Sequence, residues 1–103
     1  MANVNVQFTN NQVSVSPLQT KMQGPGAITF HPAPGATWSI TSVNGLPADW
    51  QQGANGNVYV VQDPHTGPNQ NYTYTVTITD AQGNTHTGPS GATATDPPMI
   101  MNA

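Results

Sequence analysis

Apolar and polar residues alternate along most of the chain, most clearly between Asn71 and Thr79. Every second position there is apolar or aromatic, namely Tyr72, Tyr74, Val76 and Ile78. A two-residue period is typical of a β-strand with one face in the core and the other in water. Asp80-Ala81-Gln82-Gly83 then predicts a type I turn with Gly83 in the left-handed conformation. The turn leads into a second strand in which His86 lies opposite Ile78.

The alternation near the N-terminus changes parity at Asn10-Asn11. Val4, Val6 and Phe8 precede this point, and Val13 and Val15 follow it. A two-residue hairpin turn explains the change, because it pairs Phe8 with Val13 and Val6 with Val15 on one face. A single long strand that bulges at Asn10-Asn11 and passes between two sheets explains it equally well.

Further short strands are predicted at 27–31, 37–43 and 57–62. Asn44-Gly45 and Asn55-Gly56 predict tight hairpin turns. Residues 57–62 are apolar on both faces, so we expect both faces to be covered. The last five residues, 99–103, have two interpretations, a packed arm and a flexible tail.

The composition favours one β-rich domain that spans residues 1–103. The chain has no Glu or Arg and few other helix-forming residues, whereas Thr, Val and Asn are abundant. The ten prolines fall outside the alternating segments 1–16, 48–63 and 69–88, so they separate strands. About seven short strands with regularly spaced turns predict an all-β, antiparallel β-sandwich.

In the segment 71–88, two tyrosines begin a Thr-rich strand that leads into Asp-x-x-Gly-Asn-Thr. This segment resembles the final hairpin of bacterial immunoglobulin-like, PKD-like and fibronectin-like repeats. The resemblance implies an immunoglobulin-like sandwich, with Trp38 in a central core strand. It also implies that the hydroxyl of Tyr72 or Tyr74 ties its strand to a neighbouring connection. The ending Asp96-Pro97-Pro98-Met99-Ile100-Met101-Asn102 is similar to the bacterial DP-EP family, which implies no particular activity, and its Glu-Pro motif is absent here.

Charge and residue inventory exclude several classes of function. One lysine against four aspartates gives a net charge of −3, so neither a nucleic-acid surface nor an anionic membrane surface is expected. There is no cysteine, no glycine loop before a helix and no recognisable nucleophile motif, so we expect neither an enzyme nor a cofactor. The N-terminus has no signal-peptide pattern, so a complete chain would be cytoplasmic by default, and one trimmed from a longer precursor would be secreted or surface-attached.

A metal site is chemically conceivable but is not expected. Its weak candidates are His65, His86 and Asp63, with His31 as the third histidine of the chain. None of these residues has the close spacing of known ligand motifs. His-Thr-Gly-Pro occurs at 65–68 and again at 86–89, and we interpret the repeat as a result of composition.

The candidate binding site is Trp50 with Asp49, Gln51 and Gln52. An indole flanked by amides and a carboxylate could stack on a sugar or anchor a partner protein, whereas the alternative is that Trp50 belongs to the core. The sequence therefore predicts a non-enzymatic interaction or structural module with an unknown protein partner. Self-association through an edge strand with few lysines would serve the same role, and carbohydrate binding at Trp50 is the alternative function.

Overall fold

The computed structural model describes residues 2–66, 69–88 and 98–103, and these residues form eleven β-strands and no helix. The described residues therefore contain no helix that is long and apolar enough to cross a membrane. The strands are β1 (Ala2–Thr9), β2 (Gln12–Ser16), β3 (Gln19–Met22), β4 (Gly26–Pro32), β5 (Ser39–Asn44), β6 (Gln51–Asn55), β7 (Val58–Asp63), β8 (Gln70–Thr73), β9 (Thr75–Thr79), β10 (Thr85–Gly88) and β11 (Met99–Asn102). The predicted all-β class is confirmed, and residues 99–102 form a strand.

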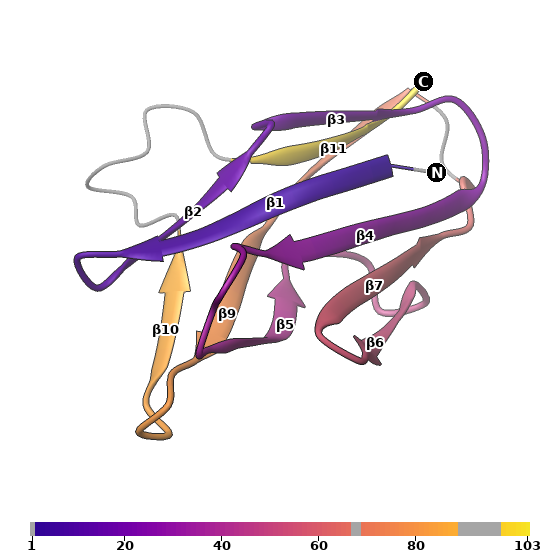
Figure 1. Ribbon diagram of the computed structural model, residues 1–103. Helices are drawn as coiled ribbons and strands as arrows, with labels where there is room; N and C mark the ends of the chain where they lie inside the picture. Colours follow the sequence, from indigo (N-terminus) through magenta and orange to yellow (C-terminus); the bar gives the residue numbers. More distant parts are fainter. Residues whose placement is uncertain (1, 67–68, 89–97) are drawn as a thin grey trace.

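The strands form three sheets, in the orders β2-β1-β4-β7-β6, β10-β9-β5 and β3-β11-β8. In Figure 1, β5, β9 and β10 cross the direction of β1 and β4 at a steep angle. Two pairs are parallel, β1 with β4 and β11 with β3. The prediction of purely antiparallel sheets is therefore wrong. The reason is that the chain turns back at the first hairpin and passes through β3 before β4, so β4 lies beside β1 in the same direction.

Alternation places the apolar rows between the sheets. The five-stranded sheet contributes Val4, Val6, Ile28, Phe30 and Val61, and the opposite layer contributes Ile40, Val43, Val76, Ile78 and Ile100, all at most 4% exposed. Phe30 meets Tyr74 edge to face, with ring centroids 5.5 Å apart. Each such side chain contributes roughly 1.5–3 kcal/mol when it is withdrawn from water. This apolar layer fixes the register of the strands.

Local turn chemistry explains three of the connections. Asn10 and Asn11 both have positive φ, at 53° and 62°, and join β1 to β2 with Phe8 opposite Val13, which confirms the hairpin over the bulged strand. Gly56, at φ 65°, begins the turn between β6 and β7. Gly83, at φ 85°, donates its N–H to the carbonyl of Asp80 at 3.0 Å, and His86 pairs with Ile78 as predicted.

Two strand predictions need correction. Asn44-Gly45 is not a hairpin, because β5 pairs with β9 and the next strand, β6, belongs to another sheet. The alternating segment 71–79 is not one strand, because the Tyr74 N–H donates to the carbonyl of Pro98 at 3.0 Å and separates β8 from β9. In β7, Tyr59 and Val61 are buried, whereas the other face, with Val58 and Val60, is only half-buried.

Gly88 closes one side of the sandwich, where β10 lies against β2. A Cβ atom added there would lie 2.6 Å from the carbonyl oxygen of Val13. We therefore predict that Gly88→Ala lowers the free energy of unfolding by about 1–3 kcal/mol, measured by chemical denaturation. Gly24→Ala is the matched control, since a Cβ there meets nothing within 4 Å. Equal stabilities of the two variants would contradict the closeness of β2 and β10.

Candidate functional site

Trp50 is a core residue. It is 5% exposed, and its ring lies edge to face against Tyr72 with centroids 4.8 Å apart. The backbone N–H of Trp50 donates to the carbonyl of Pro47 at 3.1 Å, and this turn directs the chain into β6. The face of the indole on which a sugar would stack is therefore covered by protein. Trp50 is a core tryptophan, which was the alternative to a binding residue.

Of the three neighbours of Trp50, Asp49 and Gln51 line one hollow, whereas Gln52 is not part of that lining. Gln52 has a structural role, because its Oε1 accepts hydrogen bonds from the Tyr59 hydroxyl at 2.9 Å and from the Val43 N–H at 3.2 Å. It thereby joins β6 and β7 to the edge of β5, while burial raises the pKa of the Tyr59 hydroxyl. Asp49 and Gln51 are exposed and line a shallow hollow of about 310 Å³.

Asp63 and His65 tie the connection after β7 to the C-terminal strand. Asp63 is 2% exposed, and its Oδ1 accepts from the His65 N–H at 2.8 Å and from the Asn102 Nδ2 at 3.2 Å. The His65 Nε2 lies 3.2 Å from the Met22 carbonyl oxygen. His86 pairs with Asp80 instead, so the described residues contain no group of three potential metal ligands.

The predicted tyrosine corner is not formed among the described residues. The Tyr72 hydroxyl donates to the Gln70 Oε1, at 2.8 Å on the same strand, and the buried Tyr74 hydroxyl has no partner there. Burial raises the pKa of Tyr74 accordingly. The backbone of Tyr74, bonded to Pro98, makes the link that was expected of a hydroxyl. Gly67, Pro68 and Pro89 of the repeated tetrapeptide, and residues 92–97, lie outside the described residues.

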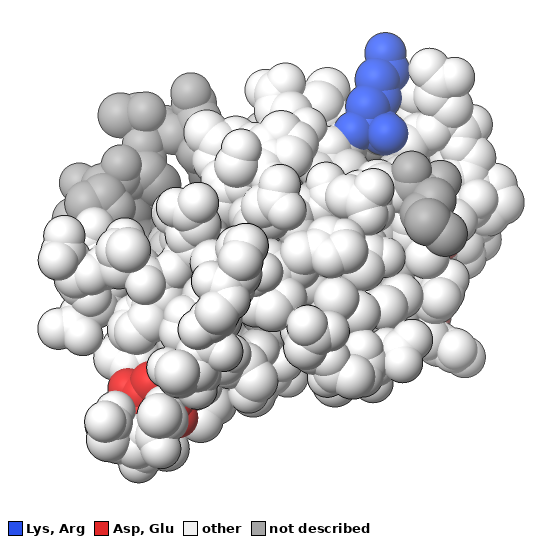
Figure 2. Space-filling view, in the orientation of Figure 1, with Lys and Arg blue, Asp and Glu red and all other residues white. Residues whose placement is uncertain are grey.

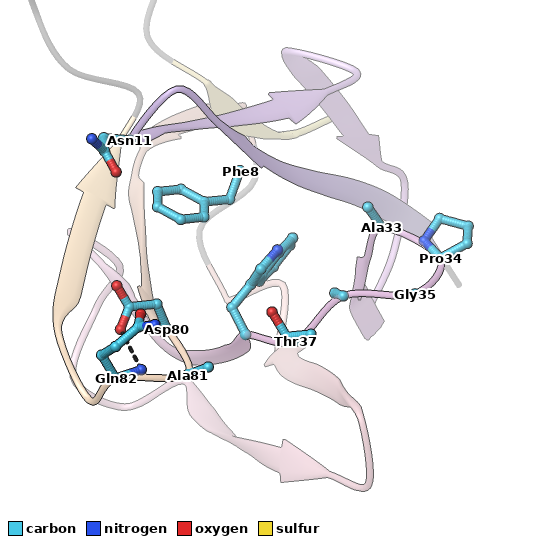
Figure 3. A pocket seen from close by; sticks show the side chains of 11 residues that line it. Phe8, Asn11, Ala33, Pro34, Gly35, Thr37, Asp80, Ala81 and Gln82 are labelled. Carbon is cyan, nitrogen blue, oxygen red and sulfur yellow. Dashed lines mark hydrogen bonds between the residues drawn. The ribbon is translucent and has the colours of Figure 1, made fainter.

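A groove of about 470 Å³ opens at one end of the sandwich, between three connections. They are the β1–β2 turn, the β4–β5 connection and the β9–β10 turn, and Figure 3 shows Asn11, Pro34 and Gln82 on different sides of the Phe8 ring. Phe8 contacts Trp38 edge to face, with centroids 6.2 Å apart, and its other neighbour is the His86 ring at 4.5 Å. Both Phe8 and Trp38 are only partly buried. We call this site the loop-end groove.

Asp80 holds the shape of one wall of the loop-end groove. Its Oδ1 accepts from the N–H groups of Gln82 at 3.0 Å and Asn84 at 2.9 Å, and its Oδ2 lies 2.9 Å from the His86 Nε2. The His86 hydrogen bond, followed by that from Asn84, lowers the pKa of Asp80 below its usual value. The sequence predicted the β1–β2 and β9–β10 turns, but it could not place them together with the β4–β5 connection at one end of the molecule.

The second candidate surface is the open edge of β6. This strand ends the five-stranded sheet, pairs with β7 alone among the described strands, and exposes all five of its residues. None of these residues is charged and none is proline. In β7, Val61 and Tyr59 are buried, and they pair with Gln52 and Ala54 of β6. Gln52 and Ala54 therefore lie on the core side of β6, and its outer face consists of Gln51, Gly53 and Asn55.

Comparison with protein-family models gave no match, and comparison with curated proteins found no protein of significantly similar sequence. The candidate sites therefore have to be judged from their own geometry.

Tryptophan fluorescence tests the different burial of the two indoles. The Trp38→Phe variant, which keeps Trp50, should emit at short wavelength and resist quenching by acrylamide, because Trp50 is enclosed. The Trp50→Phe variant, which keeps the partly buried Trp38, should emit at longer wavelength and be quenched more strongly. Strong quenching of Trp50 in a folded Trp38→Phe protein would contradict its place in the core.

The lowered pKa of Asp80 predicts a specific pH dependence of stability. A carboxyl whose pKa is lower in the folded state stabilises the fold above its unfolded pKa of about 3.9, and this contribution is lost as the pH falls through the folded value. The thermal midpoint should therefore fall more steeply below about pH 4 in the wild type than in Asp80→Asn. Asp49→Asn, at an exposed aspartate, should keep the wild-type slope. Identical slopes for wild type and Asp80→Asn would refute the role of Asp80.

Proposed function

We propose that this protein is a non-enzymatic interaction module that self-associates through the edge of β6. The proposal rests on an uncharged terminal strand, Gln51–Asn55, in which all five residues are exposed. The N–H and C=O groups on the open side of such a strand can form hydrogen bonds with another strand. Natural proteins usually protect such edges with lysine, proline or a covering element.

Other edges offer less to a partner. β3 carries the only lysine of the chain, Lys21, and Figure 2 shows that it projects from the surface. β2 and β10 lie against each other, as the contact of Gly88 with Val13 indicates. The edge of β5 is partly satisfied, because its Val43 N–H donates to Gln52. β8 is also uncharged, but it has four residues, and its Tyr72 is half-buried and packs on Trp50. We therefore assign association to β6, in which all five residues are exposed.

The partner that fits best is a second copy of the chain. Antiparallel pairing of β6 with the same strand of a second molecule about Gly53 would place Gln51 opposite Asn55 of that molecule, twice over by symmetry. Amide side chains in these positions can form hydrogen bonds with each other, and the low net charge of −3 gives little repulsion between copies. The result would be one continuous sheet through two sandwiches.

We also propose an immunoglobulin-like origin for the sandwich. In that fold one sheet contains strands A, B, E and D, and the other contains C, F and G. The order β4-β7-β6 would correspond to B-E-D, and β5-β9-β10 to C-F-G. The parallel β1 is a departure from this pattern. Kinship with the DP-EP family is a proposal that rests on the sequence 96–102 alone.

Charge substitutions on the outer face of β6 test the self-association. Lysines at both Gln51 and Asn55 would face lysines of the second copy, and we expect dimerisation to weaken by about tenfold or more. Glutamates at the same two positions should weaken it similarly, and an equimolar mixture of the two variants should form a heterodimer. Sedimentation equilibrium over a range of protein concentrations measures each case.

The matched control is Asn5→Lys with Gln7→Lys, which adds the same charge on the exposed face of the interior strand β1. This variant should dimerise like the wild type. A wild-type protein that stays monomeric at millimolar concentration would overturn the proposal. So would a lysine variant of β6 that dimerises as well as the control.

A further inference from the structure

Trp38 lines two adjoining hollows at the loop end of the sandwich. The first is the loop-end groove, and the second, of about 190 Å³, lies on the side of Asn57 and Ser39. Both hollows share the wall formed by residues 33–36. Phe8 is the one aromatic ring in contact with Trp38 among the described residues, and the contact is edge to face at 75°. A partly buried indole in this position can contact a ligand in each hollow.

The polar groups that line the two hollows are neutral and diverse. They are amides and hydroxyls, from Asn11, Thr37, Ser39, Asn57 and Gln82. Asp80 is the one charged residue lining either hollow, and both its oxygens already accept hydrogen bonds from the protein. The side chains of Asn11 and Gln82 make no hydrogen bond to another described residue. These amides can therefore donate and accept hydrogen bonds toward a ligand.

We propose that the loop-end groove binds a neutral oligosaccharide, with sugar rings stacked on the indole of Trp38. Sugar rings have apolar C–H faces that stack on aromatic rings and a rim of hydroxyls that amides bind. The absence of lysine and arginine from both linings gives no selection for an anionic sugar. The size of the larger hollow is within the range of small-molecule sites.

A proline-rich peptide is the nearest alternative occupant. Peptides of that kind dock in aromatic-lined grooves. Here the rings of Phe8 and Trp38 stand at 75° to each other, so they do not form a slot with parallel walls. The His86 ring also lies against Phe8, with centroids 4.5 Å apart. The geometry therefore favours stacking on one ring with hydrogen bonds around it. This site does not use the edge of β6, and the proposal is independent of self-association.

The test is a titration of the full chain with neutral gluco-, xylo-, manno- and chito-oligosaccharides, followed by backbone and indole N–H chemical shifts. We expect at least one series to bind saturably, with shifts centred on the Trp38 indole, Thr37 and Gln82. Trp38→Ala should weaken binding by at least about tenfold. Gln82→Ala, which removes an exposed side chain that has no hydrogen-bond partner among the described residues, should weaken binding by about two- to tenfold.

The control is Gln23→Ala, an exposed glutamine outside both hollows, which should leave the affinity unchanged. Wild-type affinity in folded Trp38→Ala would overturn the proposal, and so would shifts centred elsewhere on the molecule. Failure of every oligosaccharide at millimolar concentration, or saturable binding of a proline-rich peptide at Trp38 in place of the sugars, would also overturn it. If Trp38→Ala does not fold, Gln82→Ala still tests the proposal, because it removes an exposed side chain and keeps the core intact.

Discussion

The buried apolar residues between the two layers hold the protein together, and among them Phe30 meets Tyr74 edge to face. Phe30 is fully buried in the centre of the five-stranded sheet, and Tyr74 stands where β8 ends and β9 begins. Because the backbone of Tyr74 is bonded to Pro98, the same residue also fixes the approach to β11. Tyr74 is thereby linked to all three sheets, because its ring contacts Phe30 of the five-stranded sheet and its backbone lies between β8 and β9 of the two smaller sheets.

The scarcity of charge explains where binding can occur. A surface made chiefly of Thr, Asn, Gln and Ser gives few electrostatic contacts, as the nearly uncharged face in Figure 2 shows. Specific recognition then depends on backbone groups and on aromatic rings. The two proposed binding sites are of these two kinds, since the edge of β6 offers backbone groups and Trp38 offers an aromatic ring. Trp50 and Gln52 also carry an aromatic ring and an amide, but Trp50 is buried against Tyr72 and Gln52 forms hydrogen bonds with Tyr59 and Val43.

The sequence predicted local structure well and spatial relations poorly. The turns at Asn10-Asn11 and Asp80–Gly83 follow from residues that tolerate positive φ, and the pairing of His86 with Ile78 follows from the turn length. The parallel pairing of β1 with β4 could not be predicted, because it depends on a connection that passes through two other strands. Asn44-Gly45 has the sequence of a hairpin turn, yet tertiary pairing takes β5 to β9. The loop-end groove escaped prediction for the same reason, since Phe8, Trp38 and Asp80 meet only in three dimensions.

Amide hydrogen exchange in β6 tests most directly whether its open edge is a binding surface. The measurement compares exchange at Gln51–Asn55 in dilute and in concentrated protein, with the central strand β4 as internal reference. We expect the protection of the outward-pointing amides of β6 to rise with protein concentration while the protection of the β4 amides stays constant. Protection of β6 that does not change with concentration would contradict it.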